Sequence, residues 1–196
     1  MNLCASLIGV TALIFIAKGM AFGHGLVIIF SLLYAIISYR FAYYGEMITY
    51  LFLSTPAAAF SLIAWLKNPY EQTETVVVRT YLSLRTHITL ILITLAVTVA
   101  SYFLLDALGT ANLLVSTLSV LTSFYASALT FLRSPYYALA YSANDAVLIV
   151  LWVLASIENI SYLPMIFCFV MFLANDVYGF FNWKRIEKNQ AVGSKK

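Results

Sequence analysis

The sequence predicts an all-α integral membrane protein with seven transmembrane helices, and three observations lead to this class. Of the 196 residues, 63% are hydrophobic and only 10% are charged, whereas about a quarter of a soluble domain is charged. A soluble fold of this size could not bury so much apolar surface. The apolar residues also stand in continuous runs without strand-like alternation, which favours helices over a membrane β-barrel.

Seven apolar runs are long enough to cross a bilayer, which needs about 20 residues, or about 17 in an upright helix. The first run lacks the basic start and small-residue cleavage site of a signal peptide, so a retained helix is favoured over a cleaved leader. The second is the weakest candidate, because Gly23, His24 and Gly25 cluster at its start and indicate a loop there. The predicted spans cover residues 3–17, 21–39, 47–66, 87–105, 111–132, 136–156 and 162–183.

The basic residues predict the orientation of the chain. With seven spans, ten of the 11 Lys and Arg residues fall on one side of the membrane and only Arg40 on the other. The positive-inside rule then places the N-terminus outside and the C-terminus in the cytoplasm. Six or eight spans would scatter these charges over both sides, so the sharp division also favours seven. The one long loop, residues 67–86, lies on the cytoplasmic side.

An internal repeat organises the predicted spans into one transporter domain, residues 1–196. A shift of 118 residues pairs Leu33-Tyr34 with Leu151-Trp152 and Trp65 with Trp183. It superposes the first three spans (repeat one, 1–66) on the last three (repeat two, 111–183), with a linker helix at 87–105 and a cytoplasmic tail at 184–196. Such repeats are parallel, related by an axis along the membrane normal. Chance is the alternative, since Leu and aromatic residues are frequent and the first span matches poorly.

Two acidic residues, Asp145 and Asp176, lie within predicted spans, and each follows an asparagine, Asn144 or Asn175. Ionisable groups at membrane depth are costly, so they mark either a functional site or a structural polar contact. The sequence places no lysine or arginine at matching depth to pair with them. Both readings stay open for these residues.

The last span carries a broad polar and aromatic face. Helical spacing aligns Asn175, Tyr178 and Asn182 on one stripe, with Asp176 and Trp183 on the next. Rings stack on Tyr and Trp, amides bond carboxamides or hydroxyls, and a carboxylate stabilises a cation, so the face suits a flat, partly polar solute. Interhelical contacts are the alternative role. The candidate substrate-binding residues are Asn175, Tyr178, Trp183, Asp176, Asn182, Asn144 and Asp145.

Enzymatic chemistry has little support in the sequence. It contains no P-loop, HExxH, CxxC or GxSxG motif and no cluster with metal-ligand spacing. Cys4 and Cys168 lie in apolar runs and do not form a disulfide framework. The net charge of +3 is too modest to indicate nucleic acid. We therefore expect no enzyme, no cofactor and no nucleic-acid partner.

The segments NDAVLIVLW, NDVYGFFNWKR and LLYAIISYRFAYYGEM resemble the PnuC family of vitamin transporters, most strongly between Phe131 and Lys188. The resemblance implies seven helices arranged as three, a linker and three, like the SWEET sugar transporters, in a homotrimer. It also implies facilitated diffusion of nicotinamide riboside across the plasma membrane and trapping by a cytoplasmic kinase. The family's last-helix motif, Asn-x-x-Tyr-Gly with a Trp downstream, falls on Asn175, Tyr178, Gly179 and Trp183, which implies contact with the nicotinamide ring and amide.

The first repeat departs from the family pattern at three positions. Ala58 and Leu62 stand where riboside transporters carry a Gln and a further Trp, and Phe30 stands where they often carry Asn. Related transporters carry thiamine, riboflavin or deoxynucleosides, so these flat solutes remain alternative substrates. A membrane interaction subunit that transports nothing is the alternative from another class, and a flux measurement in liposomes distinguishes them.

Overall fold

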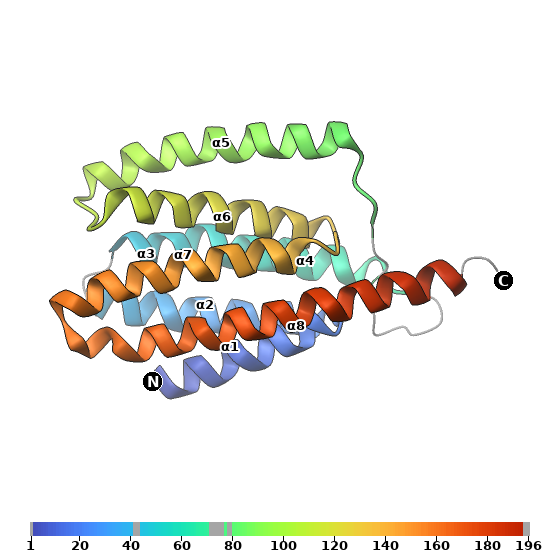
Figure 1. The fold of residues 1–196 in the computed structure, drawn as a ribbon, viewed down its shortest axis with the longest axis horizontal. Helices are drawn as coiled ribbons and strands as arrows, with labels where there is room; N and C mark the ends of the chain where they lie inside the picture. Colours follow the sequence, from blue (N-terminus) through green and yellow to red (C-terminus); the bar gives the residue numbers. More distant parts are fainter. Residues whose placement is uncertain (1, 41–43, 71–76, 78–79, 194–196) are drawn as a thin grey trace.

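The computed structural model describes residues 2–40, 44–70, 77 and 80–193, and its long elements are all helices (Figure 1). Six helical stretches are long and apolar enough to cross a membrane, and α1 is a shorter apolar helix of 16 residues. This confirms an all-helical membrane protein. The continuous helices are α1 (Asn2–Ala17), α2 (Phe22–Arg40), α5 (Leu84–Ala107), α6 (Leu113–Phe131), α7 (Tyr137–Glu158) and α8 (Leu163–Gly193).

The third span changes its helical geometry midway. It consists of α3 (Tyr44–Thr49), a π-helical turn η1 (Tyr50–Ser54) and α4 (Thr55–Leu66). Pro56, at the start of α4, has no N–H and would clash with a regular preceding turn, so the chain widens there. The Thr55 hydroxyl donates to the Tyr50 carbonyl at 2.9 Å and satisfies part of the disrupted ladder. The wide turn lies beside the interior of the bundle.

Six helical spans form a closed ring, and the remaining one stands outside it. In the order α1, α2, α4, α6, α7, α8, each helix packs against the next, and α8 returns to α1. Among the described helices, α5 packs extensively only against α6, and Figure 1 shows it along the edge of the bundle. The interior of the ring is therefore built without α5.

The turns that follow α1 and α6 have the same hydrogen-bond pattern. Gly19 and Arg133 adopt left-handed φ angles of 77° and 57°, and each amide donates over 2.9 Å to the carbonyl three residues earlier. Their own carbonyls accept from the long loop, from the amides of Val77 and Thr80. Two further pairs recur at the same separation: Lys18–Ile14 with Leu132–Ala128, and Met20–Phe15 with Ser134–Leu129.

This recurrence has a separation of 114 residues, whereas a shift of 118 matches the later spans in sequence. Four residues are about one turn of helix. A shift of 118 therefore leaves the turn after α1 about one helical turn out of register with the turn after α6.

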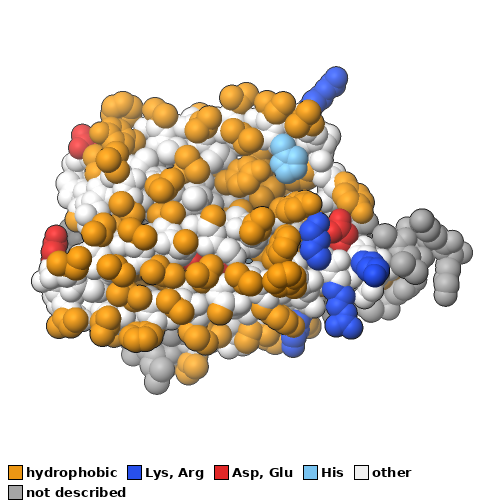
Figure 2. Space-filling view, in the orientation of Figure 1, with side chains coloured by type: hydrophobic (Ala, Val, Ile, Leu, Met, Phe, Trp, Pro, Cys, Tyr) orange, Lys and Arg blue, Asp and Glu red, His pale blue; other side chains and the backbone are white. Residues whose placement is uncertain are grey.

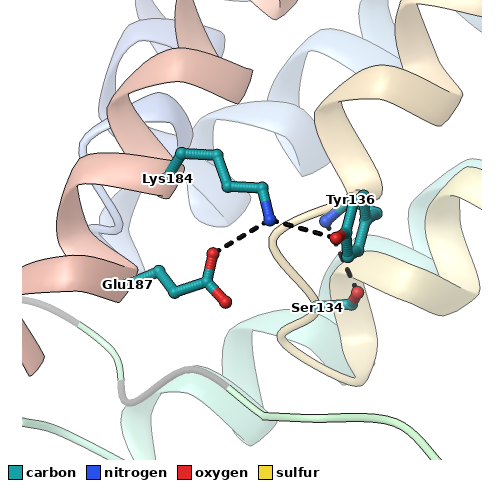
Figure 3. Close-up of polar contacts among 4 residues, drawn as sticks. All are labelled: Ser134, Tyr136, Lys184 and Glu187. Atoms are coloured by element: carbon teal, nitrogen blue, oxygen red, sulfur yellow. Dashed lines mark hydrogen bonds and ion pairs between the residues drawn. The ribbon is translucent and has the colours of Figure 1, made fainter. Parts of the chain in front are cut away.

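Basic side chains gather at one end of the bundle. Figure 2 shows hydrophobic side chains along the length of the molecule and Lys and Arg side chains toward the end where α8 terminates. There α8 continues as a helix to Gly193, through most of the segment predicted as a tail. Lys184 donates to the Tyr136 hydroxyl at 3.1 Å and to Glu187 at 3.0 Å, which ties α8 to the turn before α7 (Figure 3). Arg79, Lys195 and Lys196, which share this side in the prediction, lie outside the described residues.

Candidate functional site

The ring of helices encloses a cavity of about 120 Å³. A single water needs about 10–15 Å³ by the same measure, so the cavity has room for a small organic molecule. Every element of the ring contributes lining residues, and so does the π-helical turn of the third span, through Tyr50 and Ser54. Among the described lining residues, none comes from α5.

One wall of the cavity is apolar and partly aromatic. Phe30 of α2 meets Phe172 of α8 edge to face, with ring centroids 5.8 Å apart, and Phe169 packs against Phe172 at 5.6 Å. Gly9 of α1 lies between these rings: a Cβ there would come within 3.0 Å of both Phe172 and Phe30. This wall can contact the faces or edges of a flat ring.

The opposite wall, from α6 and α7, is rich in hydrogen-bond acceptors. The hydroxyls of Ser119 and Thr130 donate to carbonyls of their own helix, at 2.8 and 2.9 Å. Ser127 and Tyr141 share a hydrogen bond of 2.8 Å. A hydroxyl whose proton is committed to a carbonyl presents only lone pairs to its surroundings. The wall is therefore complementary to a solute that carries N–H and O–H donors.

The two carboxyl groups predicted at membrane depth meet in this cavity. Asp145 of α7 and Asp176 of α8 are 3% and 4% exposed, and both line the cavity. The second carboxyl oxygen of Asp145, Oδ2, is buried and has no partner among the described residues. No lysine or arginine occurs among the described lining residues. The pair is thus a buried acidic centre without a protein countercharge.

His24 and Ser31 of α2 also line the cavity, and the sequence reasoning missed both. Their exposed fractions are 2% and 0%, and His24 Nε2 and Ser31 Oγ have no hydrogen-bond partner in the described structure. The His24 ring lies edge-on to Trp65, with centroids 4.4 Å apart. Buried polar atoms are normally hydrogen-bonded, so two unpaired atoms beside a cavity are what a bound solute would satisfy. A histidine in an apolar helix was the available signal, but the adjacent glycines favoured a loop.

The two asparagines lie differently. Asn144 lines the cavity, and its Oδ1 accepts from the Thr122 hydroxyl at 2.8 Å, which leaves its amide nitrogen free of that contact. Asn175 is half-buried and is not among the lining residues, yet its Nδ2 is buried without a partner among the described residues. Asn144 therefore joins Asp145 and Asp176 at the cavity, whereas Asn175 stands beside it.

The three remaining predicted site residues, all on α8, lie away from the cavity. Tyr178 is 52% exposed on the outer surface. Asn182 Nδ2 donates to the Ala17 carbonyl at 2.8 Å, and the Trp183 indole donates to the Ile16 carbonyl at 3.0 Å. Carbonyls in the last turn of a helix have no partner within that helix. Asn182 and Trp183 thus satisfy the end of α1.

Trp65 donates to a carbonyl near the end of α6, as Trp183 does near the end of α1. Its indole donates to the Thr130 carbonyl at 2.9 Å, and its ring lies 5.3 Å from that of Trp183. Tyr137 packs edge-on against Trp183 at 5.2 Å and also donates to the Ile16 carbonyl. This buried aromatic cluster of Trp65, Trp183 and Tyr137 closes the end of the ring at which basic side chains gather.

Gly179 permits close helix packing and does not border the cavity. A Cβ at this position would lie 3.3 Å from the Cβ of Ala17 and 3.6 Å from that of Ala138. The residue therefore lets α8 approach α1 and α7 closely.

Comparisons with known proteins agree with this architecture. The family model described as nicotinamide mononucleotide transporter matches residues 1–185. A relative from Neisseria mucosa, named nicotinamide riboside transporter PnuC, is 29% identical over 192 residues, which cover 95% of this chain and 73% of the relative. The crystal structure of the vitamin B3 transporter PnuC superposes with a TM-score of 0.81 at 28% identity, over 95% of this chain and 81% of that one.

The family match covers all the described residues that line the cavity and every helix of the ring except the last residues of α8. Members of this family are membrane transporters and not enzymes. The helices, the enclosed cavity and the similarity over almost the whole chain lead to one assignment: the chain belongs to the PnuC family of membrane transporters.

Proposed function

We propose that this protein carries nicotinamide riboside across the plasma membrane by facilitated diffusion. The observation that supports the proposal most strongly is the cavity itself, with an aromatic wall for a flat ring and an acceptor wall for the carboxamide and ribose donors. The relative from Neisseria mucosa is named as a transporter of the same solute.

The charges around the cavity favour the riboside over the phosphorylated mononucleotide that gives the family model its description. A phosphate group is bound by arginine, lysine or clustered backbone N–H groups. The described lining residues include two carboxyl groups and neither lysine nor arginine. A phosphate in this cavity would lack a cationic partner and would be repelled by Asp145 and Asp176.

We assign the substrate contacts to Asn144, Asp145 and Asp176, joined by His24 and Ser31. Asn175 remains a proposed contact, because its unpaired Nδ2 is buried one residue before Asp176. We propose an indirect role for the other three predicted residues, Tyr178, Asn182 and Trp183. Asn182 and Trp183 hold α8 against α1, and Tyr178 lies on the outer surface of α8.

The proposed topology is three helices, a linker and three helices in parallel repeats, with α5 as the linker. The closed ring that leaves α5 outside and the recurrence of the turn after α1 in the turn after α6 support it. The described basic residues at one end of the bundle support a cytoplasmic C-terminus and an external N-terminus. A homotrimer is proposed from the family resemblance, and its mass in detergent can be measured by light scattering.

Uptake of labelled nicotinamide riboside into proteoliposomes tests the proposal. We expect saturable uptake that stops when the internal and external concentrations are equal, and a counterflow signal when liposomes are preloaded with unlabelled riboside. Thiamine, riboflavin and a deoxynucleoside serve as competitors for the alternative substrates. An absence of flux for all four solutes from well-folded protein would favour the alternative of a subunit that transports nothing.

Trapping by a cytoplasmic kinase is the second part of the proposal. Because downhill carriers only equilibrate their solute, accumulation in cells requires a reaction that consumes the internal riboside. We expect cells that contain this transporter to accumulate label only when a riboside kinase is present, and to release unmodified riboside when it is absent.

A further inference from the structure

We infer that the Asp145–Asp176 pair makes this transporter selective for flat solutes that carry one positive charge. The inference rests on the proposed function and specifies which chemical form of the solute the cavity takes. It goes beyond shape and hydrogen bonding, because a neutral analogue with the same ring, carboxamide and ribose would fit the same walls.

The geometry of the pair sets its charge. Both carboxyl groups are buried and line one cavity, so ionising one raises the free-energy cost of ionising the other. The pair therefore carries at most one negative charge, and a cation in the cavity favours the form that carries it. Both side chains are at least nine-tenths buried, so this charge has little access to solvent.

The protein offers the pair no counterion. The other ionisable side chains on the described lining are His24 of α2, Tyr50 of η1, and Tyr137 and Tyr141 of α7. The Tyr137 hydroxyl donates to the Ile16 carbonyl and the Tyr141 hydroxyl bonds to Ser127, while Asp145 Oδ2 and His24 Nε2 are unpaired among the described residues. α1, α4 and α6 contribute no ionisable side chain to that lining.

An uncompensated charge in a membrane interior is costly, and a cation of the right size removes the cost. The pyridinium ring of nicotinamide riboside carries such a charge on a flat group. The aromatic wall of Phe30 and Phe172 faces the same cavity and can hold the ring while the pair neutralises it.

The test compares three forms of one solute on the wild-type carrier in proteoliposomes. Nicotinamide riboside carries one positive charge. Its 1,4-dihydro form is neutral and keeps the carboxamide and ribose, whereas in nicotinate riboside a carboxylate replaces the carboxamide and cancels the ring charge. We expect kcat/KM for the cation to exceed that for either other form by about 10- to 100-fold, the range expected for a buried charge partner. Equal values for the cation and the dihydro form would overturn the inference and leave the proposed function intact.

Isosteric variants then locate the selectivity. In the double variant Asp145→Asn/Asp176→Asn, the ratio of cation to dihydro-form uptake should fall to about one. Asp145→Asn alone is the second variant if the double variant fails to fold, and it should lower the same ratio by a smaller factor. Asp106→Asn, an exposed acid at the end of α5, is the matched control and should keep the wild-type ratio.

A wild-type ratio retained in both acid variants would show that other groups select the charge, and the inference would be wrong. The proposed function fails differently: the wild-type carrier would then transport none of the three forms. Because selectivity is read as a ratio within one protein sample, a simple loss of folded carrier leaves it unchanged.

Discussion

Replacing Trp183 by Phe separates a role in holding α1 from a role in contacting substrate. The indole is fully buried and donates to the Ile16 carbonyl, which also accepts from the Tyr137 hydroxyl at 3.2 Å. Because that carbonyl keeps two donors, the Tyr137 hydroxyl and the Gly19 amide, the loss is one hydrogen bond, about 1 kcal/mol, plus the packing of the smaller ring, about 1 kcal/mol more. Trp183→Ala, which empties the whole site, should cost about 3–5 kcal/mol.

The shared carbonyl makes a sharper test. Tyr137→Phe alone should be mild for the same reason, since Trp183 remains as donor. The double variant Trp183→Phe/Tyr137→Phe still leaves the Ile16 carbonyl one donor, the Gly19 amide at 2.9 Å, so its loss should be about the sum of the two single losses.

Thermal unfolding in detergent and riboside binding to the folded fraction are the two measurements. For a chain of this length, about 1 kcal/mol corresponds to about 2–4 °C in Tm, so Trp183→Phe should unfold about 4–8 °C below wild type and bind nearly as well. A Trp183→Phe carrier with the wild-type Tm and no binding would refute the structural role. A double-variant loss well above the sum of the single losses would contradict the expectation that the Gly19 amide is enough to satisfy the carbonyl.

Three further predictions concern packing, the cavity and topology. Gly23→Ala should prevent normal folding, because the added Cβ would lie 2.6–2.8 Å from atoms of α1. The measurement is loss of the monodisperse peak in size-exclusion chromatography. Gly25→Ala is the control and should be tolerated, because a Cβ there meets nothing within 4 Å. Ser31→Ala should weaken riboside binding about 5- to 10-fold, which corresponds to one lost hydrogen bond. Ser156→Ala is the control: it also removes a buried, unpaired hydroxyl, but one away from the cavity, and should bind like wild type. Reporter fusions should place the C-terminus in the cytoplasm and the N-terminus outside; both ends on one side would contradict the seven-span topology.

The helices were predictable from the sequence because each one corresponds to a local apolar run. The order of these runs along the chain also limits which helices can be neighbours. Asp145 and Asp176 were found for a similar reason, since an acidic residue inside an apolar run is conspicuous wherever it points. His24 was missed because its burial depends on α4, which closes over it from a distant part of the chain. The position of Trp183 depends on where α1 ends against α8, and helical spacing alone does not reveal that the Ile16 carbonyl needs a donor.

The position of α5 has a consequence for how copies of this protein work together. The six helical spans of one chain surround the cavity on their own, and α5 lies outside this ring, against α6. A complete binding site therefore needs no neighbour. In an assembly of several copies, the cavities would operate side by side as separate routes, and inactivating one copy would reduce capacity by that copy's share while the others continued.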